Sequence, residues 1–110
     1  MKFHTLMFAL LAMTTMACGD DGGDGGGDRV DTISALTGDA ATGETVYTPC
    51  VTCHAADGSG NGFPNIQGFV EAEGERVFLE TVLEGPGIMI SYADLSDQEL
   101  ADLMAHVRTF

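Results

Sequence analysis

The stretch Cys50-Val51-Thr52-Cys53-His54 places two thiols three positions apart and an imidazole directly after the second thiol. This C-x-x-C-H spacing is typical of a c-type haem attachment site. Each thiol can bond one vinyl group of the same haem, and the adjacent imidazole can then bind the iron as an axial ligand. We therefore predict that Cys50, Cys53 and His54 hold one covalent haem c.

Two other kinds of site also use a C-x-x-C pair. A thioredoxin-like redox pair is expected beside a β-α-β pattern, and the sequence contains no convincing strand. A structural zinc site needs four ligands, but the chain has three cysteines in all and no second C-x-x-C pair. His54 and His106 could complete such a site only at an unusual spacing. Haem attachment is therefore favoured over both.

Three helices are predicted, over about residues 39–47, 74–84 and 96–108. Asp39 is a suitable N-cap for the first helix, and a Gly-Pro-Gly sequence stops the second. The third is the clearest, because Ser96 begins a capping box and apolar residues then recur at i, i+3, i+4 and i+7. This stripe consists of Leu100, Leu103, Met104 and Val107.

The N-terminal end has the pattern of an export signal. Lys2 provides the positive start and residues 3–16 the apolar stretch, so we predict a signal peptide over residues 1–17. The next residue, Cys18, completes a Thr-Met-Ala-Cys sequence that resembles the bacterial lipobox, in which the cysteine receives the lipid. The alternative is an ordinary secretory signal that leaves Cys18 free.

Residues 18–36 are predicted to be the lipidated Cys18 followed by a disordered tether. Residues 19–28 contain only Gly and Asp, which cannot bury a core. The folded unit is then expected over residues 37–110. We predict a lipoprotein anchored on the periplasmic side of a membrane, the alternative being a soluble periplasmic protein.

The charge balance is strongly acidic, with a formal net charge of −13 from four Lys and Arg against seventeen Asp and Glu. Nucleic-acid binding is excluded as a function, because it requires a basic surface. A protein partner with a basic docking face is favoured, because opposite fields steer encounter. The alternative is that the charge serves only solubility.

From about residue 38 to the C-terminus, the chain resembles the small, single-haem cytochrome c family (class I). The resemblance implies an all-α cytochrome c fold, with about three to four short helices wrapped around one covalent haem. It rests on residues in the order and approximate spacing of that family, namely Gly43, Tyr47, Cys50, Cys53, His54, Gly58, Gly60, Pro64, Gly85, Met89 and the helix over residues 96–108.

The resemblance also implies roles for single residues. Pro64 resembles the proline whose carbonyl accepts a hydrogen bond from the axial histidine, here His54, and fixes the orientation of that ring. Gly43 and Tyr47 resemble the first-helix positions that cross the last helix closely. His106 lies where the family usually has an aromatic residue at that crossing.

Met89 is the distal iron ligand that the resemblance implies, because it lies in the loop where the family places its methionine. Met104, on the apolar stripe, and His106 are the other candidates, and packing is the expected role of both. Three positions depart from the family pattern: Ile90 replaces the proline that usually follows the methionine, and Ala55 replaces the glycine that often follows the histidine. The third is Pro49, before the first haem cysteine, which is expected to bend the first helix early. The alternative for Met89 is a buried apolar side chain beside an open or His-ligated iron.

These features together predict a one-electron carrier with redox protein partners. The sequence contains no nucleophile with a matched base and no acid–base pair, so neither an enzyme activity nor a small-molecule substrate is expected. The alternative is a haem domain whose sixth site is open and binds a gas or peroxide, as a sensor or an enzyme-linked subunit. A third possibility is a structural lipoprotein whose haem is incidental.

Overall fold

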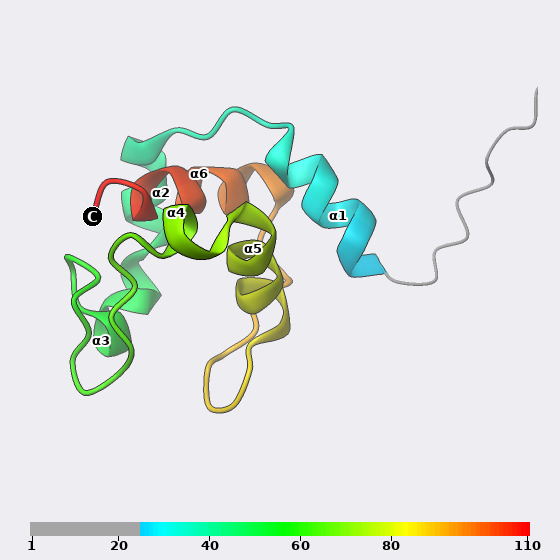
Figure 1. Cartoon of the computed structure of the whole chain (residues 1–110). Coiled ribbons are helices and arrows are strands. Elements are labelled where there is room, and N and C mark those ends of the chain that lie inside the picture. The colour runs from blue at the N-terminus through cyan, green and yellow to red at the C-terminus, as the bar shows by residue number, and fades with distance from the viewer. Residues whose placement is uncertain (1–24) are drawn as a thin grey trace, which may run out of the picture.

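A computed structural model of the chain describes residues 25–110 (Figure 1), so the predicted signal peptide and Cys18 lie outside the described residues. The described part is helical and contains no strand, which confirms the all-α fold class. It has six α-helices and one 3-10 turn. In chain order these are α1 (Gly25–Ser34), α2 (Ala40–Val46), η1 (Thr48–Cys50), α3 (Val51–His54), α4 (Phe69–Glu73), α5 (Glu75–Glu84) and α6 (Asp97–Val107).

The three predicted helices are present as α2, α5 and α6. The side chain of Asp39 accepts a hydrogen bond from the Ala41 amide at 3.0 Å, so Asp39 caps α2 as expected. Ser96 and Glu99 form the predicted capping box at the start of α6, with both of its hydrogen bonds present. The short helices α3 and α4 flank the glycine-rich segment between α2 and α5, and the sequence did not predict them.

Helices α2 and α6 cross at very close range. A Cβ added at Gly43 would overlap the backbone carbonyl of Asp102 and lie 2.9 Å from the Cβ of His106. Because only a residue without a side chain fits, glycine at this position lets the two backbones meet. The expected crossing role of Gly43 is therefore confirmed.

The core forms where the apolar faces of α1, α5 and α6 meet. The predicted stripe of α6 is buried throughout, with Leu100 at 0% and Met104 at 5% exposure. The remaining core comes from residues spread along the described chain, namely Val30, Ile33, Tyr47, Val70, Phe78, Leu79, Val82 and Ala101. Figure 1 shows α6 beside α2, and α6 also packs against α1 and α5.

Helix α1 occupies part of the segment that the sequence assigns to a disordered tether. Val30 and Ile33, three positions apart on this helix, are 1% and 0% exposed and belong to the core. The side chain of Arg29 also binds residues near the start of α6. The folded unit therefore begins before the expected boundary at residue 37, because tertiary contacts stabilise a helix that its glycine-rich first turn disfavours.

Candidate haem-binding site

A cavity of about 580 Å³ lies between the segment around α3 and the loop that follows α5. This volume is within the usual range for small-molecule and cofactor sites. Within the described part of the chain, the residues that line the cavity include no Asp, Glu, Lys or Arg. Cys50, Cys53, His54, Pro64 and Met89 all line it, so one cavity brings together the five residues that the sequence singles out.

The two cysteines lie on consecutive turns. Cys50 ends η1 and Cys53 lies in α3, and both are free, half-buried thiols. Burial, and secondarily the proximity of Cys53, raises the pKa of the Cys50 thiol to about 11. The Cys50 thiol is therefore neutral at physiological pH, unlike the activated thiolates of catalytic cysteines.

The imidazole of His54 is oriented by the segment that follows it. Its Nδ1 lies 2.9 Å from the carbonyl oxygen of Pro64, so the hydrogen bond that the resemblance implies is present. Because a carbonyl oxygen can only accept, Nδ1 carries the proton and Nε2 keeps its lone pair for a metal. The segment folds back through hydrogen bonds from Gly60 N to His54 O and from Asn61 N to Cys53 O, at 2.8 and 3.0 Å.

Ala55 has a backbone conformation that L-residues rarely adopt, with φ 65° and ψ 163°. Among the described residues it is the one non-glycine residue with positive φ. Its carbonyl accepts a hydrogen bond from the Tyr47 hydroxyl at 2.6 Å. Burial is the main cause that raises the pKa of Tyr47 to about 12, so this hydroxyl stays a donor. The turn after His54 therefore keeps a conformation typical of glycine although alanine occupies it.

Met89 lies in the loop over residues 85–95, which we call the Met89 loop. The loop begins at Gly85, whose φ of 62° is left-handed and where a Cβ would lie 2.7 Å from the carbonyl oxygen of Met89. Met89 is half-buried against the core, whereas its neighbours Ile88 and Ile90 are 85% and 70% exposed. The thioether is thus the side chain of this tripeptide that packs inward.

Met104 and His106 lie elsewhere. Met104 is 5% exposed in the core and does not line the cavity. The His106 ring packs against the rings of Tyr47 and Phe110, with centroid separations of 5.2 and 5.1 Å. Both therefore have the packing roles expected for them. Within residues 25–110 there is no group of three or more His, Cys, Asp or Glu that could hold a metal ion.

Several cavity residues were not identified from the sequence. They are apolar or aromatic residues of α4, α5 and the loops, and their spacing alone carried no signal of a shared site. The largest are Phe63, Phe69, Phe78 and Tyr92. Tyr92 lines the cavity together with Cys50 and Cys53. Burial, followed by the proximity of Cys50 and Cys53, raises the pKa of Tyr92.

This set of residues fits a haem. A flat, mostly apolar macrocycle needs an apolar cavity, and covalent attachment needs two thiols on adjacent turns beside an available imidazole nitrogen. The cavity supplies all of these, together with a thioether on the loop after α5. The fold and the site thus define a c-type cytochrome domain.

Comparison with known proteins gives the family. Residues 38–107 match the family described as cytochrome C oxidase, cbb3-type, subunit III, and the chain belongs to this family of cytochrome c domains. It is 38% identical over 86 residues to cytochrome c4 of Pseudomonas aeruginosa, covering 67% of this chain and 39% of that protein. It is 33% identical over 88 residues to cytochrome c-552 of Thermus thermophilus, covering 63% of this chain and 67% of that protein.

The chain thus spans about two fifths of the cytochrome c4 and two thirds of the cytochrome c-552 that it matches. No solved structure shows a significant match to the chain. Membership of the family means that the chain carries covalent haem c. Between Gly25 and the C-terminus, none of the helices has the length and apolar character needed to cross a membrane.

Proposed function

We propose that this protein is a one-electron carrier of an extracytoplasmic electron-transfer chain, with His54 and Met89 as the two axial ligands of its haem. The observation that carries the proposal is the shared cavity, which joins the C-x-x-C-H segment to the half-buried thioether of Met89. His and Met ligation is the combination found in electron-carrying cytochromes c.

The bound haem c supplies an iron that accepts and releases single electrons. The residues of the chain orient and shield it. The carbonyl of Pro64 accepts a hydrogen bond from the Nδ1–H of His54 and so orients the ring, which leaves Nε2 available to bind the iron. Apolar side chains from α4, α5 and α6 line the cavity and exclude water. A thioether ligand in such a site favours the ferrous state and raises the reduction potential.

Absorption spectra of the purified oxidised and reduced protein test this proposal. We expect a low-spin haem that stays bound to the chain under denaturing conditions, with the far-red band of a sulfur–iron bond. Met89→Ala should remove that band, lower the reduction potential and allow carbon monoxide to bind the reduced protein. Met104→Leu is the matched control, because it replaces a buried methionine of similar volume outside the cavity and should preserve all three properties.

Ile90 is exposed and occupies the position where the resemblance implies a proline. This observation favours a second candidate function. A loop without that rigid residue can leave the sixth site of the iron open to a gas or peroxide. Rapid carbon monoxide binding by the unmodified reduced protein, with a high-spin haem, would support this sensor or enzyme-linked role and reject the closed carrier.

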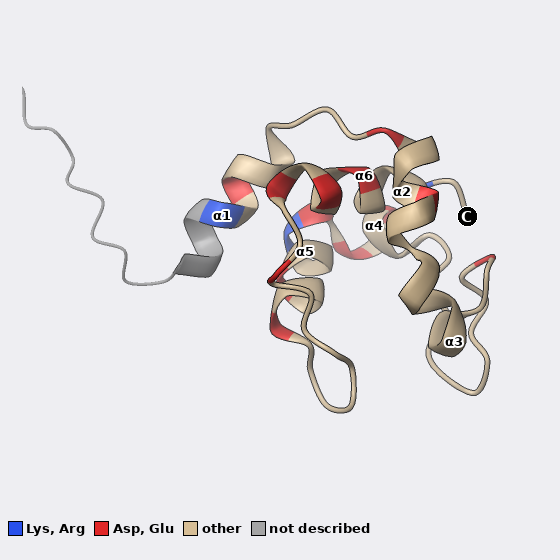
Figure 2. Ribbon diagram, turned by 180° about the vertical axis from the view of Figure 1, so that it is seen from behind, with Lys and Arg blue, Asp and Glu red and all other residues tan. Residues whose placement is uncertain are grey.

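The distribution of charge supports a redox partner with a basic docking face. Figure 2 shows Asp and Glu on the helices around the site, whereas the Met89 loop is free of charge as far as Ala93. The three arginines of the described chain are each paired with carboxylates. We propose that the net negative field steers the partner, and that the apolar surface beside the cavity, with Ile88 and Ile90, makes the contact.

We also propose that Cys18 carries a lipid that anchors the protein on the periplasmic side of a membrane. The support is the sequence around it, a short apolar segment that ends in a lipobox-like cysteine. Cys18→Ser should move the haem protein from the membrane fraction to the soluble fraction and abolish fatty-acid labelling. Labelling that persists in this variant would refute lipidation at Cys18.

A further inference from the structure

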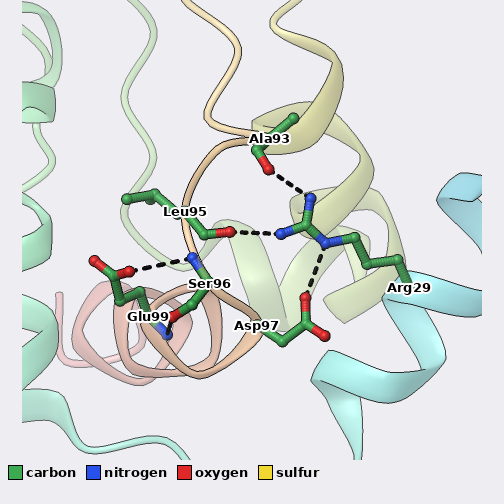
Figure 3. Close-up of polar contacts among 6 residues, drawn as sticks. All are labelled: Arg29, Ala93, Leu95, Ser96, Asp97 and Glu99. Carbon is green, nitrogen blue, oxygen red and sulfur yellow. Dashed lines mark hydrogen bonds and ion pairs between the residues drawn. The ribbon is translucent and has the colours of Figure 1, made fainter.

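Helix α1 precedes the part of the chain that matches the cytochrome family, since the match begins at residue 38. The side chain of Arg29, a residue of α1, reaches the segment between Met89 and α6, as Figure 3 shows. The guanidinium donates to the Ala93 carbonyl at 2.6 Å, to the Leu95 carbonyl at 2.5 Å and to the Asp97 carboxylate at 2.8 Å. One side chain of α1 thus binds three residues that lie 64 to 68 positions later in the chain.

The segment that Arg29 binds is the last part of the Met89 loop, which has no helix or strand of its own. Near its middle, the loop is tied to α5 by hydrogen bonds from Tyr92 N to the Val82 carbonyl at 2.9 Å and from the Ser91 hydroxyl to the Leu83 carbonyl at 2.6 Å. Arg29 adds two charged hydrogen bonds to backbone carbonyls at the end that leads into α6. Charged hydrogen bonds contribute more than neutral ones, and Arg presents several donors in a fixed fork.

The helix that carries Arg29 is itself held in place. Val30 and Ile33 are fully buried on one side of α1. On another side, the guanidinium of Arg76 from α5 lies 2.5 Å from the carboxylate of Asp31. The Arg29 side chain is also only 28% exposed, so its ion pair is less screened than a typical surface pair. A guanidinium on a fixed helix can restrain a loop, whereas one on a flexible tether cannot.

We propose that Arg29 is a positioning residue of the haem site: it fixes residues 93–95 and thereby holds the Met89 loop in the conformation that turns the thioether inward. The inference rests on the proposed ligation of the iron by Met89. It assigns α1 a role in the electron-transfer site although α1 lies outside the segment that matches the family.

Three variants of the haem-loaded full-length protein test the proposal. Arg29→Met removes the guanidinium but keeps an apolar stem. Arg29→Lys keeps a positive charge for Asp97 but loses the fork that reaches two carbonyls. Arg108→Met is the matched control, because Arg108 pairs with Glu71 and Glu75 and binds no residue of the Met89 loop.

The first measurement is hydrogen exchange of the Tyr92 and Leu95 amides, relative to the Tyr47 amide of the α2 end, which bonds to the Gly43 carbonyl. We expect Arg29→Met to speed exchange in the loop at least about tenfold relative to Tyr47, and Arg29→Lys to have a smaller effect in the same direction. Arg108→Met should leave the ratio unchanged. A ratio in Arg29→Met within about twofold of the wild type would overturn the proposal.

The second measurement separates positioning from general stability. On heating, Arg29→Met should lose the far-red sulfur–iron band well below the temperature at which helical circular dichroism is lost, whereas Arg108→Met should lose both together. Loss of both signals together in Arg29→Met would mean a purely structural role and reject the inference. A wild-type protein without the band would instead refute Met89 ligation, and the exchange ratios would still decide whether Arg29 restrains the loop.

Discussion

Replacing Ala55 by glycine is expected to stabilise the haem-loaded protein. Ala55, the residue after His54, has φ 65° and ψ 163°, a region that is essentially restricted to glycine. Holding a non-glycine residue there costs about 1–3 kcal/mol. The amide of Ala55 donates a hydrogen bond to the Val51 carbonyl, and its carbonyl accepts one from the Tyr47 hydroxyl. Both hydrogen bonds use backbone atoms of Ala55, so they survive the change to glycine.

Glycine also has a cost, because it makes the unfolded chain more flexible by about 0.4–1 kcal/mol. The difference gives a net stabilisation of about 1 kcal/mol, which corresponds to a rise in Tm of roughly 4–8 °C for a domain of this size. Urea titration of the oxidised holoprotein, followed by the haem absorption and by far-ultraviolet circular dichroism, measures it as a shift of the midpoint at constant slope.

Ala56→Gly is the matched control, because the neighbouring Ala56 is exposed and does not have a positive φ. It adds the same flexibility to the unfolded chain without relieving strain, and should therefore destabilise the protein by about 0.4–1 kcal/mol. A midpoint for Ala55→Gly that is equal to or below that of the wild type would refute the assignment of strain to this turn.

Three further predictions concern the helix crossing and the charge. Gly43→Ala should destabilise the fold by about 3 kcal/mol or more in urea titration, because the added Cβ overlaps the Asp102 carbonyl and forces α2 and α6 apart. The control Glu44→Ala, on the exposed side of α2, should stay within about 0.5 kcal/mol of wild type. Equal effects of the two variants would contradict the close crossing. Asp102→Ala should lower the free energy of unfolding by about 1–3 kcal/mol, because the buried carboxylate accepts a hydrogen bond from the Asp39 amide at 2.8 Å and its removal leaves that amide unpaired. Asp102→Asn keeps an acceptor and should be less destabilising. Equal losses of stability in the two variants would count against this hydrogen bond. Finally, the second-order rate of electron transfer to a basic partner protein should fall as ionic strength rises from 0.01 to 0.15 M, because the screening length drops from about 30 to about 8 Å. The rate with an uncharged redox reagent should stay constant. A salt-independent rate with the basic partner would exclude electrostatic steering.

The attachment segment could be predicted from the sequence because its information is local. Two cysteines and a histidine lie within five positions, on the consecutive turns η1 and α3, and the structure places them together around a single cavity. The capping residues Asp39 and Ser96 are also local signals, since each bonds to an amide two or three positions away. The contact between His54 and Pro64 spans ten residues and was expected only from the resemblance.

Helix α1 could not be predicted, because what stabilises it lies far along the chain. Its first three residues are glycines, the poorest helix formers apart from proline. Val30 and Ile33 form too short an apolar pattern to indicate a helix alone, and the partners of Arg29 lie beyond residue 92. The short helices α3 and α4, of four and five residues, likewise depend on tertiary contacts and not on propensity.

The folding of α1 onto the domain also limits how far the cytochrome can travel if Cys18 is lipidated. A tether over the whole of residues 18–36 could extend to roughly 60 Å, enough to reach partners well away from the bilayer. With Gly25 already helical, only residues 19–24 separate the lipid from the folded body, a reach of at most roughly 25 Å. The haem would then exchange electrons within a thin layer above the lipid headgroups, with neighbours in or on the same membrane.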